Sequence, residues 1–245
     1  LMKSIKLAIN EIFFSIQGEG KTVGIPSVFV RLGGCNLICG GEGTQNDKKL
    51  HNNAKWRCDT IEVWRKSKSI NIHSVLDIKY INQLKKGAHL IITGGEPLIQ
   101  QENLILFLNY IKKITGCYIE IETNGTIIPN KKLLELVDLF NCSPKLSSSG
   151  NNKDDCIVPQ ALKAINSKSR DSIFKFVVSE NKDLNEILKD FNKYISREKI
   201  WLMPAGENQK YLNKNRKKVI DICKKENFKF SNRLQIDIWN QKTGV

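Results

Sequence analysis

Short apolar runs alternate with longer amphipathic stretches along the 245 residues of the chain. The short runs are rich in β-branched residues and predict strands at 28–32, 89–93, 118–122, 139–142, 173–178, 199–203 and 234–239. The stretches between them repeat apolar residues every three or four positions and predict helices, around 104–111, 184–191 and 219–223. Strands that alternate with helices predict parallel βαβ units. We therefore expect an α/β fold in a single domain spanning residues 1–245.

The composition narrows the class of protein. Hydrophobic residues make up 40% of the chain and aromatic residues 8%, which is enough for a sizeable core and excludes wholesale disorder. No apolar run reaches the roughly 18 residues of a transmembrane helix, and from the pattern of the first ten residues we expect no signal peptide. The 39 Lys and Arg residues exceed the 25 Asp and Glu residues by 14. We interpret this excess as a solvated basic surface, with a nucleic-acid partner as the alternative, and expect a cytoplasmic protein without membrane contact.

The seven cysteines fall into two groups. An odd number of cysteines in a chain without an export signal argues against a disulfide framework. Four are scattered and are interpreted as small buried hydrophobes: Cys117, Cys142, Cys156 and Cys223. The other three, Cys35, Cys39 and Cys58, flank an irregular segment at about 40–57 that is rich in Gly, Asn and Lys. A loop of that length inside a compact domain is usually functional or mobile.

Three clustered thiols leave two kinds of metal site open. A structural zinc site needs four ligands, so His51 would have to complete it. An iron–sulfur cluster held by three cysteines would keep one iron open for a ligand, and this alternative fits the residues better. We expect His51 to face solvent.

Polar and glycine-rich clusters follow nearly every predicted strand. They occur at 31–35, 93–97, 122–125, 143–145, 179–180 and 204–206. Because ligands of parallel α/β proteins bind at the carboxyl ends of the strands, these clusters predict one site ringed by strand ends. Glycine pairs there allow sharp turns and a close approach of a ligand to the backbone.

These motifs together resemble the radical S-adenosylmethionine superfamily and, within it, the 7-carboxy-7-deazaguanine synthases. The resemblance spans the chain and rests on residues 10–13 (NEIF), 15–20 (SIQGEG), 29–37 (FVRLGGCNL), 58–60 (CDT), 93–97 (TGGEP), 122–126 (ETNGT), 143–145 (SPK) and the tail from Trp239 to Val245. Each motif alone is weak, and the set is specific.

The resemblance implies a modified, incomplete (β/α) barrel that forms homodimers. It implies a [4Fe–4S] cluster on Cys35, Cys39 and Cys58, S-adenosylmethionine bound to its open iron, and Mg²⁺ bound through Thr60. A radical derived from the cofactor would take hydrogen from 6-carboxy-5,6,7,8-tetrahydropterin, which would rearrange and lose ammonia to give 7-carboxy-7-deazaguanine. The cluster would be reduced by an electron donor such as flavodoxin or ferredoxin.

The same resemblance assigns binding roles residue by residue. The implied substrate contacts are Ile16, Gln17, Gly18, Arg31 and Thr93. The implied S-adenosylmethionine contacts are Gly95, Ser143, Pro144, Lys145, Met203, Pro204, Ala205 and Gly206.

Side-chain chemistry supports several of these roles. Arg31 offers a charged fork for a substrate carboxylate, and Gln17 offers the donor and acceptor that a pterin edge requires. Glu96 and Glu122 could each meet the cofactor's ammonium or ribose hydroxyls, and the alternative for either is a carboxylate at a helix start.

The chain departs from the family pattern in two places. The third cysteine would normally follow the second by three residues, but that position is Glu42, and the insert delays the thiol to Cys58. The tail reads Trp239-Asn240 where relatives commonly have Trp-Gly. We expect the glycines beside Cys39 to let the insert loop out and return, since loop closure costs little extra with length.

Two competing functions remain open at the level of the sequence. One is another radical S-adenosylmethionine enzyme, such as a glycyl-radical activase, which would leave Gln17 and Arg31 unexplained. The other is a basic metal-containing module that binds nucleic acid.

Overall fold

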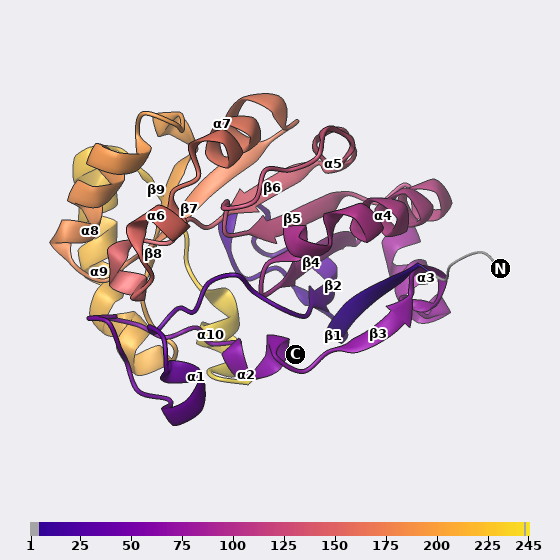
Figure 1. Ribbon diagram of the computed structural model, residues 1–245, viewed down its shortest axis with the longest axis horizontal. Coiled ribbons are helices and arrows are strands. Elements are labelled where there is room, and N and C mark those ends of the chain that lie inside the picture. Colours follow the sequence, from indigo (N-terminus) through magenta and orange to yellow (C-terminus); the bar gives the residue numbers. More distant parts are fainter. Residues whose placement is uncertain (1–4, 243) are drawn as a thin grey trace.

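A single nine-stranded sheet organises the computed structural model, which describes residues 5–242 and 244–245 (Figure 1). Its strands are β1 (Lys6–Ile16), β2 (Pro26–Leu32), β3 (Lys68–Asn71), β4 (His89–Gly94), β5 (Ile119–Thr123), β6 (Leu139–Cys142), β7 (Ser172–Val178), β8 (Ile200–Pro204) and β9 (Lys229–Phe230). They are ordered β3-β1-β2-β4-β5-β6-β7-β8-β9, so the sheet is open. From β2 to β9 all neighbours are parallel, whereas β1 is antiparallel to β2 and β3. The expected α/β fold with an incomplete barrel is confirmed.

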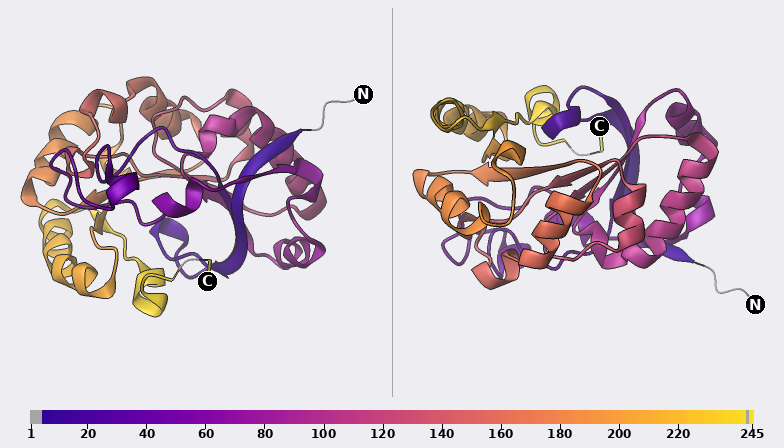
Figure 2. Two further views of the ribbon diagram at one scale, coloured as in Figure 1. Left: turned by 60° about the horizontal axis from the view of Figure 1, so that its bottom comes forward. Right: turned by 90° about the horizontal axis from the view of Figure 1, so that it is seen from above.

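The helices divide between the outside of the sheet and its open side. They are α1 (Thr44–Asp47), α2 (Ile61–Trp64), α3 (Ile78–Lys85), α4 (Gln101–Thr115), α5 (Lys131–Leu136), α6 (Lys153–Cys156), α7 (Pro159–Lys168), α8 (Asn181–Glu186), α9 (Gln209–Glu226) and α10 (Leu234–Trp239), with a π-helical turn at Ile187–Phe191. Figure 1 shows α4, α5 and α7 along the top of the sheet and α1, α2 and α10 together at the bottom. The right-hand view of Figure 2 shows the yellow helices α9 and α10 near each other. No helix in the described part of the chain is long and apolar enough to cross a bilayer.

The core forms where the parallel strands are covered by the outer helices. In α4 the predicted positions Leu104, Phe107, Leu108 and Ile111 are all buried, as their helical spacing indicates. The central strands are buried along almost their whole length, which explains why they read as continuous apolar runs rather than alternating ones. Cys117, Cys142, Cys156 and Cys223 are buried too, and the interpretation of these four as small hydrophobes is confirmed.

One predicted strand is wrong. Residues 234–239 form α10, a helix closed by hydrogen bonds from the Asp237 amide to the Arg233 carbonyl and from the Asn240 amide to the Ile236 carbonyl. Its alternating apolar residues resemble a half-buried strand, but only Ile236 is buried and Ile238 is 52% exposed. A run this short cannot be assigned to helix or strand by its period.

The strand pattern also missed β1, β3 and β9. β1 is the first strand along the chain, and most of its residues are half-buried, so its burial shows no clean alternation. β3 has four residues, of which Lys68 and Ser69 are exposed, and β9 has only two residues. The antiparallel start of the sheet was therefore not foreseen.

Candidate active site

The register of the sheet brings the predicted site residues together near the carboxyl ends of the parallel strands. Arg31 of β2 lies beside Thr93 of β4, and Glu122 of β5 lies beside Asn141 of β6. The Thr93 hydroxyl donates to a Glu122 carboxylate oxygen at 2.8 Å. The sequence prediction of a site ringed by strand ends agrees with this placement.

Gln17 links the loop after β1 to these strand ends. Its amide nitrogen donates to Glu120 (3.2 Å) and to Glu122 (3.1 Å), while its amide oxygen accepts from the backbone of Gly18 and Glu19. The buried side chain is thus fully engaged within the protein. The main chain is engaged as well, since the Gln17 amide donates to the Ile25 carbonyl at 2.9 Å and the Gly18 carbonyl accepts from the Leu234 amide at 2.9 Å, whereas the Ile16 side chain is exposed.

Glu120 is a site residue that the sequence analysis missed. It is fully buried and accepts hydrogen bonds from Thr22 (2.5 Å) and Asn141 (2.9 Å). Burial, reinforced by the nearby charge of Glu122, raises the pKa of Glu120 to about 7. The signal in the sequence was two carboxylates two residues apart in one strand, which places both on the same face.

A buried ion pair lies beside these carboxylates. Lys175 of β7 is buried and its ammonium contacts Glu19 at 2.5 Å. Burial alone would raise the pKa of Glu19, but the positive charges of Lys175 and Arg233 outweigh it and hold that pKa well below its usual range. Neither Glu19 nor Lys175 was foreseen as a site residue.

Gly94 and Gly95 bring the turn after β4 against the end of β2. A Cβ on Gly95 would lie 2.0 Å from the Gly34 carbonyl oxygen and 2.7 Å from the Cys35 Cβ. Gly94 has a φ of +144° and also packs on the backbone of Leu32. Only glycine permits this approach, so the pair is what sets the distance between the turn and Cys35.

Glu96 is fully buried directly after this glycine pair. Its carboxylate accepts hydrogen bonds from the Thr123 hydroxyl (2.7 Å) and from the backbone amides of Asn124 (2.6 Å) and Leu98 (3.0 Å). Burial raises the pKa of Glu96 against these hydrogen bonds. Glu96 thus matches the alternative of a carboxylate at a helix start, and its contact with S-adenosylmethionine stays a prediction.

The insert leaves the barrel at Cys39 and returns to it at Cys58. The Cys58 amide donates to the Cys39 carbonyl at 3.1 Å, so the two cysteines are backbone neighbours despite the 18 residues between them. Inside the insert, Gly40 and Lys55 hydrogen-bond to Ser149 and Ser148 respectively. The loop also contains α1, which the sequence analysis did not foresee.

The chemistry of the three thiols fits an iron–sulfur cluster. Burial raises the pKa of Cys35 to about 11 and that of Cys39 to about 12, and the charges of the three cysteines influence one another. Thiolates at such positions need a nearby cation, which iron would provide. Within the described residues, however, no three His, Cys, Asp or Glu side chains are arranged to hold a metal ion.

His51 has a partner other than the cysteines. Its Nε2 lies 3.0 Å from both carboxylate oxygens of Asp47, and the side chain is only 35% exposed. The expectation that it faces solvent is therefore only partly met.

Thr60 begins α2 without capping it by its side chain. Its carbonyl accepts from the amides of Val63 and Trp64, but its hydroxyl makes no cap hydrogen bond and lies 3.5 Å from the Cys58 sulfur. The hydroxyl thus remains on the side of the cysteines.

The remaining predicted contacts surround the same strand ends. Lys145 donates to the Ser143 hydroxyl at 3.0 Å, lies 6.0 Å from the Trp56 ring centre, and lowers the pKa of Cys35 and Cys39 against the effect of burial. Met203, Pro204 and Ala205 are buried, and all three lie at the end of β8 or directly after it. Arg31 donates to Glu11 at 2.7 Å, an ion pair that orients its guanidinium.

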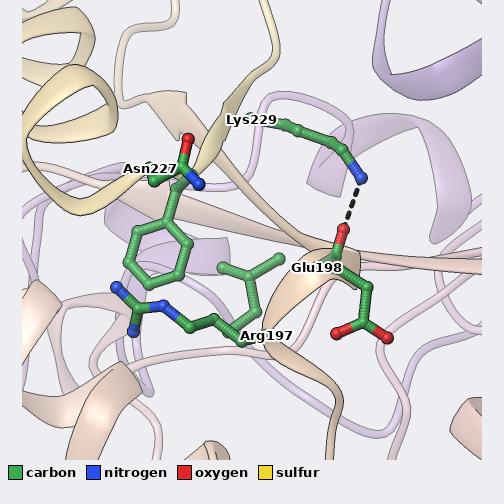
Figure 3. A pocket seen from close by; sticks show the side chains of 6 residues that line it. Arg197, Glu198, Asn227 and Lys229 are labelled. Carbon is green, nitrogen blue, oxygen red and sulfur yellow. Dashed lines mark hydrogen bonds between the residues drawn. The ribbon is translucent and has the colours of Figure 1, made fainter.

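A cavity of about 410 Å³ lies where β8 and β9 begin, away from the strand ends that carry the candidate site (Figure 3). It is lined by Arg197, Glu198, Ile200, Asn227, Phe228 and Lys229, which belong to the amino ends of β8 and β9. Arg197 stacks on Phe228 at 4.3 Å and the Lys229 ammonium binds the Glu198 carbonyl. The cavity holds none of the predicted site residues.

We predict that Glu120→Gln flattens the pH dependence of stability. Folded Glu120 keeps its proton up to about pH 7, whereas the unfolded chain releases it near 4.5. The folded state thus binds more protons between these values, and the free energy of unfolding should fall as pH rises through them, by on the order of 3 kcal/mol. Denaturant unfolding at pH 5 and pH 8 measures this difference.

The matched control for this experiment is Glu135→Gln. The Glu135 side chain is 63% exposed, so its replacement should preserve the parent's pH dependence. A Glu120→Gln protein whose stability changes with pH as the parent's does would contradict the role of the buried carboxyl.

Comparisons with known proteins follow this geometry. No protein-family model matches the chain. The 7-carboxy-7-deazaguanine synthase of Halobacterium salinarum is 31% identical over 257 residues, covering 96% of this chain and 91% of that protein. Its counterparts from Pyrobaculum aerophilum (30% over 240 residues, 98% and 97%) and Aquifex aeolicus (33% over 215 residues, 85% and 82%) are similarly related.

A solved structure, described as QueE from Escherichia coli, matches the fold. It superposes with a TM-score of 0.63 at 24% identity and covers 94% of both chains. Together with the end-to-end similarity to the curated relatives, the motifs have one consistent explanation: the chain belongs to the 7-carboxy-7-deazaguanine synthase family of radical S-adenosylmethionine lyases.

Proposed function

We propose that the chain converts 6-carboxy-5,6,7,8-tetrahydropterin to 7-carboxy-7-deazaguanine with loss of ammonia. The observation that carries the proposal is the gathering of Arg31, Thr93 and the Gln17 loop at one edge of the sheet, next to the cysteine-flanked loop. Family membership supports the same reaction. The product is a 7-deazapurine, the class of compound from which queuosine is made.

The substrate would lie between a positive and a negative part of this edge. Arg31, oriented by Glu11, would bind the substrate carboxylate, because a guanidinium binds carboxylates through two parallel hydrogen bonds. Thr93 and the segment 16–18 would lie against the ring. Glu122, which Thr93 and Gln17 hold in place, would accept hydrogen bonds from ring nitrogens or from cofactor hydroxyls.

The cofactor would lie against the neighbouring strand ends. We assign its binding to Gly95 and Glu96 after β4, Glu122 at the end of β5, the segment 143–145 after β6, and the segment 203–206 after β8. The close approach of Gly95 to Cys35 supports this arrangement, because it leaves the backbone of the turn beside the cluster loop. When bound, the cluster and S-adenosylmethionine would supply the radical chemistry, and the protein would position the substrate and exclude water.

Cys35, Cys39 and Cys58 would hold the [4Fe–4S] cluster. The support is the return of Cys58 to the backbone of Cys39 and the pairing of His51 with Asp47 rather than with a thiol. Thr60 would contribute its hydroxyl to Mg²⁺, a hard cation that needs few protein ligands because it keeps several waters.

Partners and location complete the proposal. Phe14, Ile16, Val23 and Ile25 are exposed apolar side chains around the β1–β2 connection, and we propose that a second copy of the chain covers them in a homodimer. A reducing compartment such as the cytoplasm suits seven free cysteines, and a flavodoxin or ferredoxin would reduce the cluster.

The proposed reaction can be tested directly. After anaerobic reconstitution with iron and sulfide, and with S-adenosylmethionine, Mg²⁺ and dithionite as reductant added, we expect 7-carboxy-7-deazaguanine to form from carboxypterin. Loss of ammonia alone leaves this conversion redox-neutral, so the hydrogen returns from the cofactor and 5′-deoxyadenosine should stay far below the amount of product. Cys58→Ser should lose the iron and the cluster absorbance, whereas Cys117→Ser and His51→Ala should retain both. Deoxyadenosine without any carboxypterin product would favour an activase instead, and a full cluster in Cys58→Ser would exclude that thiol as a ligand.

Arg31→Ala should weaken carboxypterin binding while leaving the iron content normal. A charged hydrogen bond of this kind is worth about 1.5–3 kcal/mol, which corresponds to roughly a ten- to hundred-fold rise in Kd. Glu11→Gln is the matched control, because it breaks the same ion pair and keeps the guanidinium. Equal binding by Arg31→Ala and the parent would remove Arg31 from the substrate site.

Thr60→Ala should raise the Mg²⁺ concentration for half-maximal turnover several-fold, whereas Thr60→Ser should resemble the parent. The melting temperature should stay unchanged in Thr60→Ala, because the hydroxyl makes no cap hydrogen bond to lose. If both variants showed the parent's Mg²⁺ dependence, Thr60 would not be a magnesium ligand.

A further inference from the structure

One arginine contacts three segments of the site at once. Arg233 directly precedes α10, and its side chain is 12% exposed. Its Nε donates to Glu19 at 2.9 Å, its Nη1 to the Gly206 carbonyl at 2.6 Å, and its Nη2 to the Asp59 carboxylate. The three partners, at positions 19, 59 and 206, come from three separate segments of the chain.

Each partner is next to residues with a proposed role. Glu19 follows the segment 16–18 of the substrate loop, Asp59 stands between Cys58 and Thr60, and Gly206 ends the segment 203–206. A guanidinium is planar and rigid, so three donors on one fork fix the mutual positions of their acceptors. Arg233 therefore sets where the cluster loop stands relative to the substrate loop.

The residues around Arg233 strengthen this connection. The Leu234 amide donates to the Gly18 carbonyl at 2.9 Å, and the Gln235 side chain donates to Glu19 at 2.6 Å. A Cβ on Gly18 would lie 2.1 Å from the Gln235 side-chain oxygen, so the two segments are packed without a gap. On the other side, Lys175 occupies the second carboxylate oxygen of Glu19.

The charges explain why an arginine is needed here. Glu19 and Asp59 carry two negative charges, and Lys175 and Arg233 carry two positive charges, so these four side chains together are neutral. Glu19 and Lys175 could remain paired without Arg233. Asp59 is 44% exposed and could be solvated alone, so burial does not require its contact with Arg233. What the contact provides is the connection between the two loops.

We propose that Arg233 is a positioning residue that couples cofactor binding to substrate binding, by holding Asp59 of the cluster loop and Glu19 of the substrate loop on one guanidinium. This inference rests on the proposed function for the identity of the two ligands. Since coupling between sites is reciprocal, occupation of either loop by its ligand should favour binding at the other.

The first test measures the loops in the purified protein without any ligand. Hydrogen–deuterium exchange should become faster in residues 15–20 and 57–64 together in Asp59→Asn and in Arg233→Gln. Arg216→Gln is the matched control, since it removes a different arginine–carboxylate pair, with Asp237 of α10, that contacts neither loop. Faster exchange in only one loop, or equal loosening in the Arg216→Gln control, would overturn the proposal.

The second test measures the coupling in the reconstituted protein. Saturating carboxypterin should lower the Kd of S-adenosylmethionine at least about five-fold in the parent, the lower end of usual couplings between sites. The ratio should fall below two-fold in Arg233→Gln and Asp59→Asn, lie between these values in Arg233→Lys, and stay at the parent's value in Arg216→Gln. Asp59→Asn keeps the experiment interpretable if Arg233→Gln fails to fold.

The outcomes separate this inference from the proposed function. If the parent forms no 7-carboxy-7-deazaguanine but exchange becomes faster in both loops of the Asp59→Asn variant, the proposed function is refuted and the connection through Arg233 is supported. A parent that forms the product, with the full Kd ratio retained in Asp59→Asn, would refute the role of Arg233 and leave the function standing.

Discussion

The hydrogen bonds of the buried Glu96 carboxylate hold together the strand ends that carry the candidate site. It accepts from the amides of Asn124 and Leu98 and from the Thr123 hydroxyl, and its own amide donates to the Gly34 carbonyl at 2.8 Å. One residue thereby ties the ends of β2, β4 and β5 together. Losing one partner of a buried carboxylate leaves a desolvated group unpaired, which costs more than an ordinary hydrogen bond. The glycines before Glu96 are needed for the same reason, because they let its turn reach Gly34.

The hydrogen bonds around Glu96 extend to the cluster loop through amides. Asn124 donates to the Asn36 side chain at 2.9 Å, and Asn36 donates to the Thr126 hydroxyl at 2.8 Å. Asn36 is the neighbour of Cys35, so the turn after β5 fixes the start of the cluster loop. At the other end of the loop, the Asn10 side chain donates to the carbonyls of Val63 in α2 and of Lys66 just after it. Both ends of the loop are therefore held by polar side chains of the barrel.

The sequence predicted the parallel part of the fold and the strand ends where the site lies, because buried strands read as continuous apolar runs and the helices repeat apolar residues every three or four positions. It did not predict the antiparallel start, since β1 is half-buried on both faces and has no clean period. It mistook α10 for a strand, because six residues are too few to distinguish the two. The roles of Glu120, Lys175 and Arg233 depend on contacts between distant segments, and Arg233 lies more than 170 residues from both Asp59 and Glu19. No local pattern encodes such contacts.

The insert shows how a family site can tolerate a change in spacing. A cluster held by Cys39 and Cys58 would depend on the distance between the two residues rather than on the number of residues between them, and one backbone hydrogen bond brings the two together. Each doubling of loop length adds only about 0.6 kcal/mol to the entropy of closure, which is less than one such contact can offset. Further bonds from the insert to Ser148 and Ser149 fasten it to the barrel. Asp59 then returns to Arg233, so the insertion lengthens the path of the chain while the contacts at its two ends keep the site in register.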